Sequence, residues 1–229
     1  SPLAPGAWTV HTGEVQLFDE GGSASEALEK LAEDGVNSDL ADALQVDAGL
    51  VSPFAPGVYA VYSASNPVFV DGQPSSGALE ALAEDGDPSG YDFSSEPMAT
   101  GAAFTTPVSG GGPAPIFPGE MYQVSFSASE GDQLAFATML VQSNDLFAGA
   151  GGIALFSNGM PVSGDITGEV QLWDAYTEMN QFPGAGGDQA PRQSGMDTGT
   201  AESGNVGVVN DAFTYPAVSD MIRVSITAN

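Results

Sequence analysis

Cysteine is missing from this 229-residue sequence, and basic residues are nearly so. Without cysteine the chain has no disulfide framework, no thiolate metal site and no cysteine nucleophile. The three basic residues, Lys30, Arg192 and Arg223, stand against 30 Asp and Glu, which gives a formal net charge of −27. Nucleic-acid affinity depends on Lys and Arg that neutralise phosphates, so this composition excludes nucleic acid as a partner.

Histidine occurs once, and long apolar runs do not occur. His11 lies in the segment WTVHT and no serine sits in a GxSxG motif, so nothing predicts a serine–histidine nucleophile. The glycine-rich phosphate-binding motifs are missing too, and one His without Cys does not predict a zinc site. With no apolar stretch of about 18–20 residues, we expect no membrane insertion. The sequence predicts that the chain is not an enzyme.

The acidity of the chain requires cations in its surroundings. At a net charge of −27 the chain repels itself unless salt is plentiful or divalent cations are bound. A saline habitat, an acidity tuned only for solubility, and a specific cation-binding role all fit this composition. The chain starts with Ser1 and shows no basic segment followed by an apolar one, as is typical of a secreted protein whose signal peptide has been removed, and a chain trimmed for another reason would look the same. We therefore expect a secreted or cell-surface location.

Glycine, proline and alternating segments are plentiful and favour strands. The 30 Gly and 16 Pro, with 42% hydrophobic residues, indicate a folded chain of many short strands joined by turns. Four segments alternate or run apolar as strands do: 121–128, 131–141, 168–174 and 222–227. We predict an all-β fold, an antiparallel β-sandwich, with short helices in its N-terminal half.

An internal repeat occupies the first hundred residues. PGAWTV (5–10) matches PGVYAV (56–61), and EALEKLAEDG (26–35) matches GALEALAEDG (77–86), with the same 51-residue offset in both pairs. Each copy predicts a strand followed by a short helix, the first capped by Ser25 and ended by Gly35. We interpret the repeat as a duplicated packing unit without chemistry of its own.

The domain prediction follows from this repeat. We expect one domain over 1–229, with 1–50 and 51–100 as the duplicated units and 101–229 carrying the main strands. GGPAPIFPGE (111–120) could be a linker between two domains, but the N-terminal strands would then have nothing to pair with.

Calcium is the cofactor that the acidic loops favour. Ca²⁺ takes six to eight oxygen ligands from carboxylates, amides and carbonyls. QSNDLFAG (142–149) places Asn144 and Asp145 just after a predicted strand, and LWDAYTEMNQF (172–182) places Asp174 and Glu178 at the end of another. No EF-hand pattern is present, and the spacing alone fits a solvated acidic loop about as well as a calcium site.

The segments 24–35, 118–149, 168–180 and 189–193 resemble the bacterial branch of the spondin domain family. That resemblance implies a C2-like β-sandwich, secretion, and a calcium ion held between loops at one end. It assigns Asp145, Asp174 and Glu178 as metal ligands, whereas Tyr176 stands where the family usually has Gly. Animal members act in the extracellular matrix and in cell adhesion.

Two hypotheses for function follow. The first is a secreted calcium-binding adhesion or structural module whose partners are divalent cations, copies of itself, or components of the extracellular matrix and cell surface. The second is a carboxylate-dependent extracellular polysaccharide hydrolase, which would need two facing carboxylates in a cleft. The apolar arm SPLAPGAWTV (1–10) predicts either an added strand on a neighbour or an edge strand of its own sandwich. Arg192 and Arg223 are expected to pair with carboxylates or carbonyls inside the fold.

Overall fold

The computed structural model describes residues 3–7, 17–18, 20–48, 53–184, 186–190 and 192–228. The chain divides into two compact units. Unit 1 comprises Ser1–Val51 and Phe213–Pro216, and unit 2 comprises Ser52–Ala212 and Ala217–Asn229. The first repeated helix belongs to unit 1 and the second to unit 2, and a single domain over 1–229 stays a prediction.

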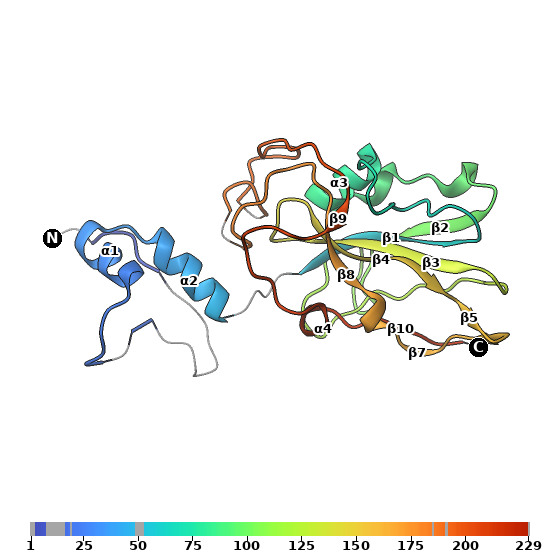
Figure 1. Ribbon diagram of the computed structural model, residues 1–229, viewed down its shortest axis with the longest axis horizontal. Helices are drawn as coiled ribbons and strands as arrows, with labels where there is room; N and C mark the ends of the chain where they lie inside the picture. The colour runs from blue at the N-terminus through green and yellow to red at the C-terminus, as the bar shows by residue number, and fades with distance from the viewer. Residues whose placement is uncertain are drawn as a thin grey trace. The chain divides into compact units, whose positions relative to one another are not determined.

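Unit 1 contains two helices, α1 (Glu26–Asp34) and α2 (Ser38–Ala48) (Figure 1). The Leu28 N–H donates to Ser25 Oγ at 3.2 Å, and Gly35 ends α1 at a φ of 69°. Both predicted caps are therefore confirmed, whereas α2 was not predicted. Most of the strand predicted at 5–10, and His11, lie outside the described residues.

Unit 2 is built on an antiparallel six-stranded sheet in the order β2-β1-β3-β4-β8-β9. Its strands are β1 (Phe54–Tyr62), β2 (Ala99–Phe104), β3 (Gln133–Leu140), β4 (Leu146–Ala154), β8 (Gln171–Asp174) and β9 (Gly207–Val208). Two small sheets pair β5 (Phe156–Ser157) with β6 (Met160–Pro161), and β7 (Gly164–Asp165) with β10 (Ser225–Ile226). The short helices are α3 (Gly77–Asp85), α4 (Val218–Met221), η1 (Pro88–Gly90), η2 (Phe93–Ser95) and η3 (Thr167–Glu169).

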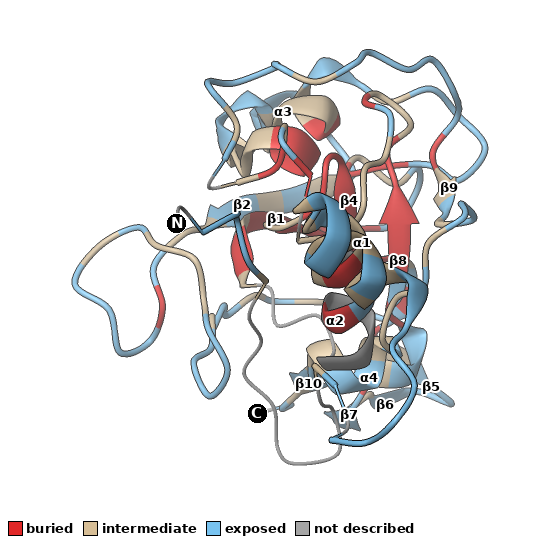
Figure 2. Ribbon diagram, turned by 90° about the vertical axis from the view of Figure 1, so that its left-hand side faces the viewer, coloured by how far each residue is buried: buried red, intermediate tan, exposed pale blue. Residues whose placement is uncertain are grey.

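One face of the sheet packs against α3, the helix of the second repeat (Figure 1). Leu79 and Leu82 of α3 are fully buried against Val58 and Phe147 of the strands, and Figure 2 shows β8 and the inner side of α3 in red. Ser76 caps α3 and Gly86 ends it at a φ of 65°, as in α1. The structure thus confirms that both LxxLAEDG segments form the same capped helix. They differ in burial, because none of the α1 residues is buried.

The strand predictions are confirmed in part. Segment 131–141 contains β3, and the ends of segments 168–174 and 222–227 form β8 and β10. Segment 121–128 is a correction, since it belongs to no sheet. Its aromatic residues still turn inward, with Phe126 5.9 Å from Tyr59 and Tyr122 5.1 Å from Phe104 between ring centroids. It therefore lies over the sheet without strand pairing.

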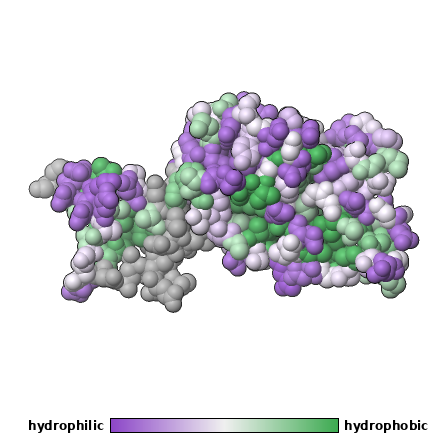
Figure 3. Space-filling model, in the orientation of Figure 1, coloured by the Kyte–Doolittle hydropathy of each residue, from purple (hydrophilic) through white to green (hydrophobic). Residues whose placement is uncertain are grey.

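The fold is mostly β, which confirms the coarser part of the fold prediction. The two facing sheets of a β-sandwich stay a prediction. Among the described helices, none combines the length and the apolar character that a bilayer crossing requires. On the face drawn in Figure 3, patches of hydrophobic residues in unit 2 alternate with hydrophilic areas.

Candidate functional site

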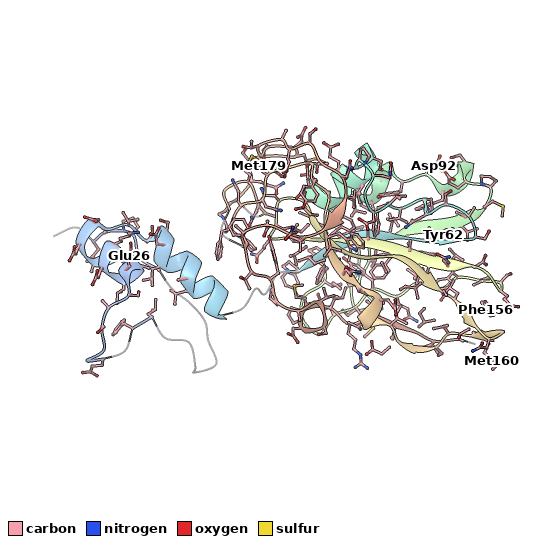
Figure 4. The ribbon with its side chains drawn as sticks, in the orientation of Figure 1. Glu26, Tyr62, Asp92, Phe156, Met160 and Met179 are labelled. Atoms are coloured by element: carbon pink, nitrogen blue, oxygen red, sulfur yellow. The ribbon has the colours of Figure 1, made fainter. Side chains whose placement is uncertain are left out.

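Four buried carboxyl groups gather in unit 2 where the ends of β8 and α3 meet the turn before β4. We call Glu84, Asp145, Asp174 and Glu178 the carboxylate cluster. Their exposed fractions are 6%, 0%, 1% and 5%. Met179, labelled in Figure 4, marks the loop after β8 that carries Glu178. Carboxyl groups are rarely this buried without a charged partner, which makes the cluster the candidate site.

Asp145 is held by the loop after β8. Its Oδ2 accepts hydrogen bonds from the Thr177 N–H at 2.8 Å, the Thr177 Oγ1 hydroxyl at 3.2 Å and the Glu178 N–H at 3.1 Å. The turn between β3 and β4 directs Asp145 inward, because Ser143 Oγ accepts from the Leu146 N–H at 3.1 Å. The other carboxylate oxygen, Asp145 Oδ1, is buried and has no hydrogen-bond partner among the described residues.

Asp174 ends β8 and shapes the same loop. Its Oδ1 accepts from the Tyr176 N–H and its Oδ2 from Asn180 Nδ2, both at 2.7 Å. Tyr176 has a φ of 54°, the left-handed conformation that glycine adopts most easily. The loop therefore holds Tyr176 in a backbone conformation that glycine would adopt without strain.

Glu178 lies against a glycine from a distant part of the chain. A Cβ built on Gly199 would overlap Glu178 Oε1, so the carboxylate occupies the space that the side chain of any other residue would fill. Residue 178 pairs with Ala201 in an isolated bridge, and the Met179 N–H donates to Thr200 O at 2.8 Å. Glu178 Oε1 is buried and, like Asp145 Oδ1, accepts no hydrogen bond of standard geometry within the described ranges, although the nearby Asn144 amide acts to lower the pKa of Glu178 against the larger effect of burial.

A buried amide network surrounds the cluster. Asn144 Oδ1 accepts from the Gln181 N–H at 2.8 Å and from Gln189 Nε2 at 2.9 Å. Gln189 is fully buried and fixes the Gly184 N–H through its own Oε1 at 2.8 Å. Asn144 Nδ2 has no partner in the described part of the chain. The sequence pointed to Asn144 but not to Gln189. The segment QAPRQ (189–193) contains this amide, but nothing in it indicates that Gln189 is buried.

Glu84 is the second residue that sequence reasoning missed. It lies in the repeated LAEDG segment, which we interpreted as helix packing alone. Its counterpart in the first copy, Glu33, is exposed. The single difference that marks Glu84 is its burial, and no local sequence signal carries that information.

Burial raises the pKa of every member of the cluster. It raises the pKa of Asp174 to about 7, with the charge of Asp145 adding to the shift. Burial likewise raises the pKa of Glu84 to about 7 and shifts the pKa values of Asp145 and Glu178 upward. Glu84 and Asp174 are therefore only partly ionised near neutral pH, and a bound cation would favour their ionised forms.

No basic side chain in the described residues forms an ion pair with the cluster. Lys30 bridges Glu26 and Asp39 in unit 1. Arg223 pairs with Asp165 at 3.2 Å on the surface of unit 2, and Arg192 donates to the carbonyls of Gly184 and Gly186. The pairing expected for the two arginines is confirmed, but its expected place inside the fold is wrong, because both residues are exposed. Neither supplies charge to the cluster.

The structure brings the three predicted ligands into one region. Leu146, next to Asp145, pairs with Asp174 across β4 and β8, and the Ala175 N–H donates to the Asp145 carbonyl at 3.2 Å. Within the described ranges, however, no three Asp, Glu or His side chains are arranged to hold a metal ion. The unpartnered oxygens of Asp145 and Glu178 fit calcium chemistry, while convergence of all three carboxylates on one ion stays a prediction.

An open hollow of about 350 Å³ lies elsewhere in unit 2. It is lined by Asn66, Phe69, Val70, Asp71, Gly151, Gly152 and Trp173. Asp71 is its one carboxylate, so this hollow lacks the facing pair that a glycosidase requires.

Compared with models of known protein families and with curated protein sequences, the chain matches none.

Proposed function

We propose that this chain is a secreted calcium-binding module that adheres or assembles outside the cell rather than catalysing a reaction. The observation that supports the proposal most directly is the pair of buried, unpartnered carboxylate oxygens, Asp145 Oδ1 and Glu178 Oε1. A buried anionic oxygen without a donor or cation destabilises the folded state. A divalent cation bound there removes that cost.

The donor chemistry favours calcium over softer metals. The cluster offers carboxylate, amide and backbone oxygens and neither imidazole nor thiolate, and hard cations prefer such ligands. Asp145 and Glu178 would contribute their free oxygens. Asp174, whose oxygens already accept two hydrogen bonds, would contribute a further carboxylate or hold the loop in place.

Two further features fit a binding module. The segments that carry Asp145, Asp174 and Glu178 occur in the order seen in spondin domains, whose animal members act in adhesion. The cluster is also buried, and a polysaccharide chain cannot reach carboxyl groups with exposed fractions of 6% or less. The buried cluster therefore favours a structural ion over the alternative of a carboxylate-dependent hydrolase.

The proposal is tested by calcium titration of the full chain. Isothermal titration calorimetry near pH 7.5, after removal of metal by chelator, is expected to show a single calcium site. Calcium at a hundred times its dissociation constant should stabilise the fold by about 2.7 kcal/mol. Asp145→Asn should weaken binding at least tenfold, whereas Glu169→Gln, an exposed carboxylate outside the cluster, should not. No heat of binding together with a melting temperature indifferent to chelator would refute the calcium site.

A further inference from the structure

The two edges of the six-stranded sheet are protected differently. β9, at one edge, has two residues and is too short to template another strand. β2, at the other edge, has six residues, ATGAAF, without charge or proline. Natural proteins usually blunt a long edge with charged residues, proline, a bulge or a covering segment. Figure 2 shows β2 largely exposed.

The register shows which backbone groups of β2 point away from the sheet. The Ser63 N–H donates to Met98 O at 3.1 Å and extends the β1–β2 ladder by one pair. Bonded residues alternate along an antiparallel ladder, so Gly101 and Ala103 direct their N–H and C=O groups outward. The Ala114 N–H bonds to Thr105 O at 3.0 Å, in the same outward series. Along the described residues, nothing pairs with the outward groups of Gly101 and Ala103.

β2 and the segment that follows it carry little charge, whereas Asp92 and Glu96 flank η2, which contacts β2. Between residues 97 and 129 the one charged residue is Glu120, whose carboxylate accepts from the Phe117 N–H at 2.9 Å. Exposed apolar side chains lie beyond both ends of the strand. Met98 precedes β2, while Val108 and Met121, joined by a 2.9 Å backbone hydrogen bond, lie beyond its far end.

We propose that β2 pairs antiparallel with β2 of a second copy of this chain. Pairing centred on Ala102 places Gly101 of each copy opposite Ala103 of the other, so that their outward N–H and C=O groups bond to one another. The same two-fold axis brings Met98 of one copy to the end of β2 where Val108 and Met121 of the other lie.

The partner at the β2 edge is a second copy of this chain because β2 carries no charge and its outward backbone groups are complementary to those of another β2. Two chains of net charge −27 repel each other, and β2 itself has no charged residue to add to that repulsion, which Asp92 and Glu96 contribute beside the first residues of the strand. Within β2 itself, a partner rich in Lys and Arg would find no carboxylate to pair with, and Asp92 and Glu96 lie only beside its first residues. The inference supplies a surface for the assembly part of the proposed function and rests on that part, but not on calcium binding.

Sedimentation velocity of the full chain over a wide range of protein concentration tests the pairing. We expect a reversible dimer that tightens as NaCl is raised, because salt screens the repulsion. Ala103→Pro removes an outward N–H at an edge position where proline is tolerated, so the fold should persist. The dimer dissociation constant should rise at least about tenfold, as expected for lost backbone hydrogen bonds.

A second variant tests the pairing in case Ala103→Pro does not fold. Ala102→Glu places like charges opposite each other across the two-fold axis and should weaken the dimer in a salt-dependent way. Ala154→Glu, at an exposed position of β4, is the matched control and should leave the dimer unchanged. A chain monomeric at every concentration and salt, or a dimer that survives both Ala103→Pro and Ala102→Glu, would overturn the pairing. A dimer that dissociates only in chelator would overturn the pairing and assign assembly to the cation site. Calcium titration measures binding at that site independently of dimerisation.

Discussion

Single residues decide how the carboxylate cluster is enclosed. Tyr176 takes a left-handed backbone conformation that costs most residues about 1–2 kcal/mol, and it does so between Asp174 and the Thr177 N–H that holds Asp145. Strained backbone of this kind persists where the surrounding structure fixes it. Gly199 also helps to enclose the cluster, because its lack of a side chain leaves room for the Glu178 carboxylate.

Gly199→Ala is expected to displace the Glu178 side chain. The added methyl would occupy the position of Oε1, and overpacking of this kind costs about 1–3 kcal/mol. Thermal melts without calcium should show a lower melting temperature than that of the unmodified chain. Melts over a range of calcium concentrations should show that the calcium affinity is at least tenfold weaker. Gly168→Ala, where a Cβ meets nothing within 4 Å, is the control. Unchanged calcium affinity in Gly199→Ala would remove Glu178 from the site.

At the scale of elements, the repeat gives two nearly identical helices in different surroundings. α1 and α3 share their caps and their Leu stripe, but Leu82 is fully buried while Leu31, at the equivalent position, is half-buried. Similar local sequences thus dictate the same helix without dictating the same packing.

Leu82→Ala should cost about 2–5 kcal/mol of unfolding free energy, as is usual for a large-to-small change in a core. Leu31→Ala should change the unfolding free energy of the same transition by no more than about 0.5 kcal/mol, the usual range for substitutions outside a core. Urea denaturation followed by tryptophan fluorescence in a Trp8→Phe background, which leaves Trp173 in the core of unit 2 as the one tryptophan, measures this transition. Equal losses in the two variants would mean that α1 contributes to that core as much as α3 does.

Local patterns predicted individual elements better than their pairing. The helix caps at Ser25, Gly35 and Gly86 and the apolar run that becomes β3 were readable from sequence. Segment 121–128 alternates as a strand does, yet it joins no sheet, because alternation reports which side chains are buried and not which backbone groups find partners.

The candidate site shows the same limit. The positions of Asp145, Asp174 and Glu178 beside strand ends, with the resemblance, indicated the region. Glu84, Gln189 and Gly199 join it only through tertiary contacts, so no local signal could have named them.

At the scale of the whole molecule, the buried cluster links stability to pH. Glu84 and Asp174 have pKa values of about 7 in the folded state, against ordinary values of 4.5 and 3.8. Below the ordinary values the groups are protonated in both states and impose no cost. As pH rises from about 4 through 7, the unfolded chain ionises freely while the folded state resists, so the free energy of unfolding falls.

Urea denaturation at pH 5 and pH 8 in chelator should therefore show lower stability at the higher pH. Saturating calcium should reduce that loss, because the cation stabilises the ionised cluster. Glu84→Gln removes one of the two groups and should flatten the dependence in chelator. Stability that rises from pH 5 to pH 8 without calcium would contradict the raised pKa values.

The contact between Glu178 and Gly199 also bears on when the site forms during synthesis. Strands β1, β2, β3, β4 and β8 are complete once residue 174 has emerged, whereas the backbone that encloses the Glu178 carboxylate arrives only with residues 199–201. A nascent chain can thus pair nearly all of its sheet before its carboxylate cluster is closed. If the proposed calcium site exists, only the completed chain would bind the ion, and a product truncated between residues 180 and 198 would carry the acidic groups without the backbone that encloses Glu178.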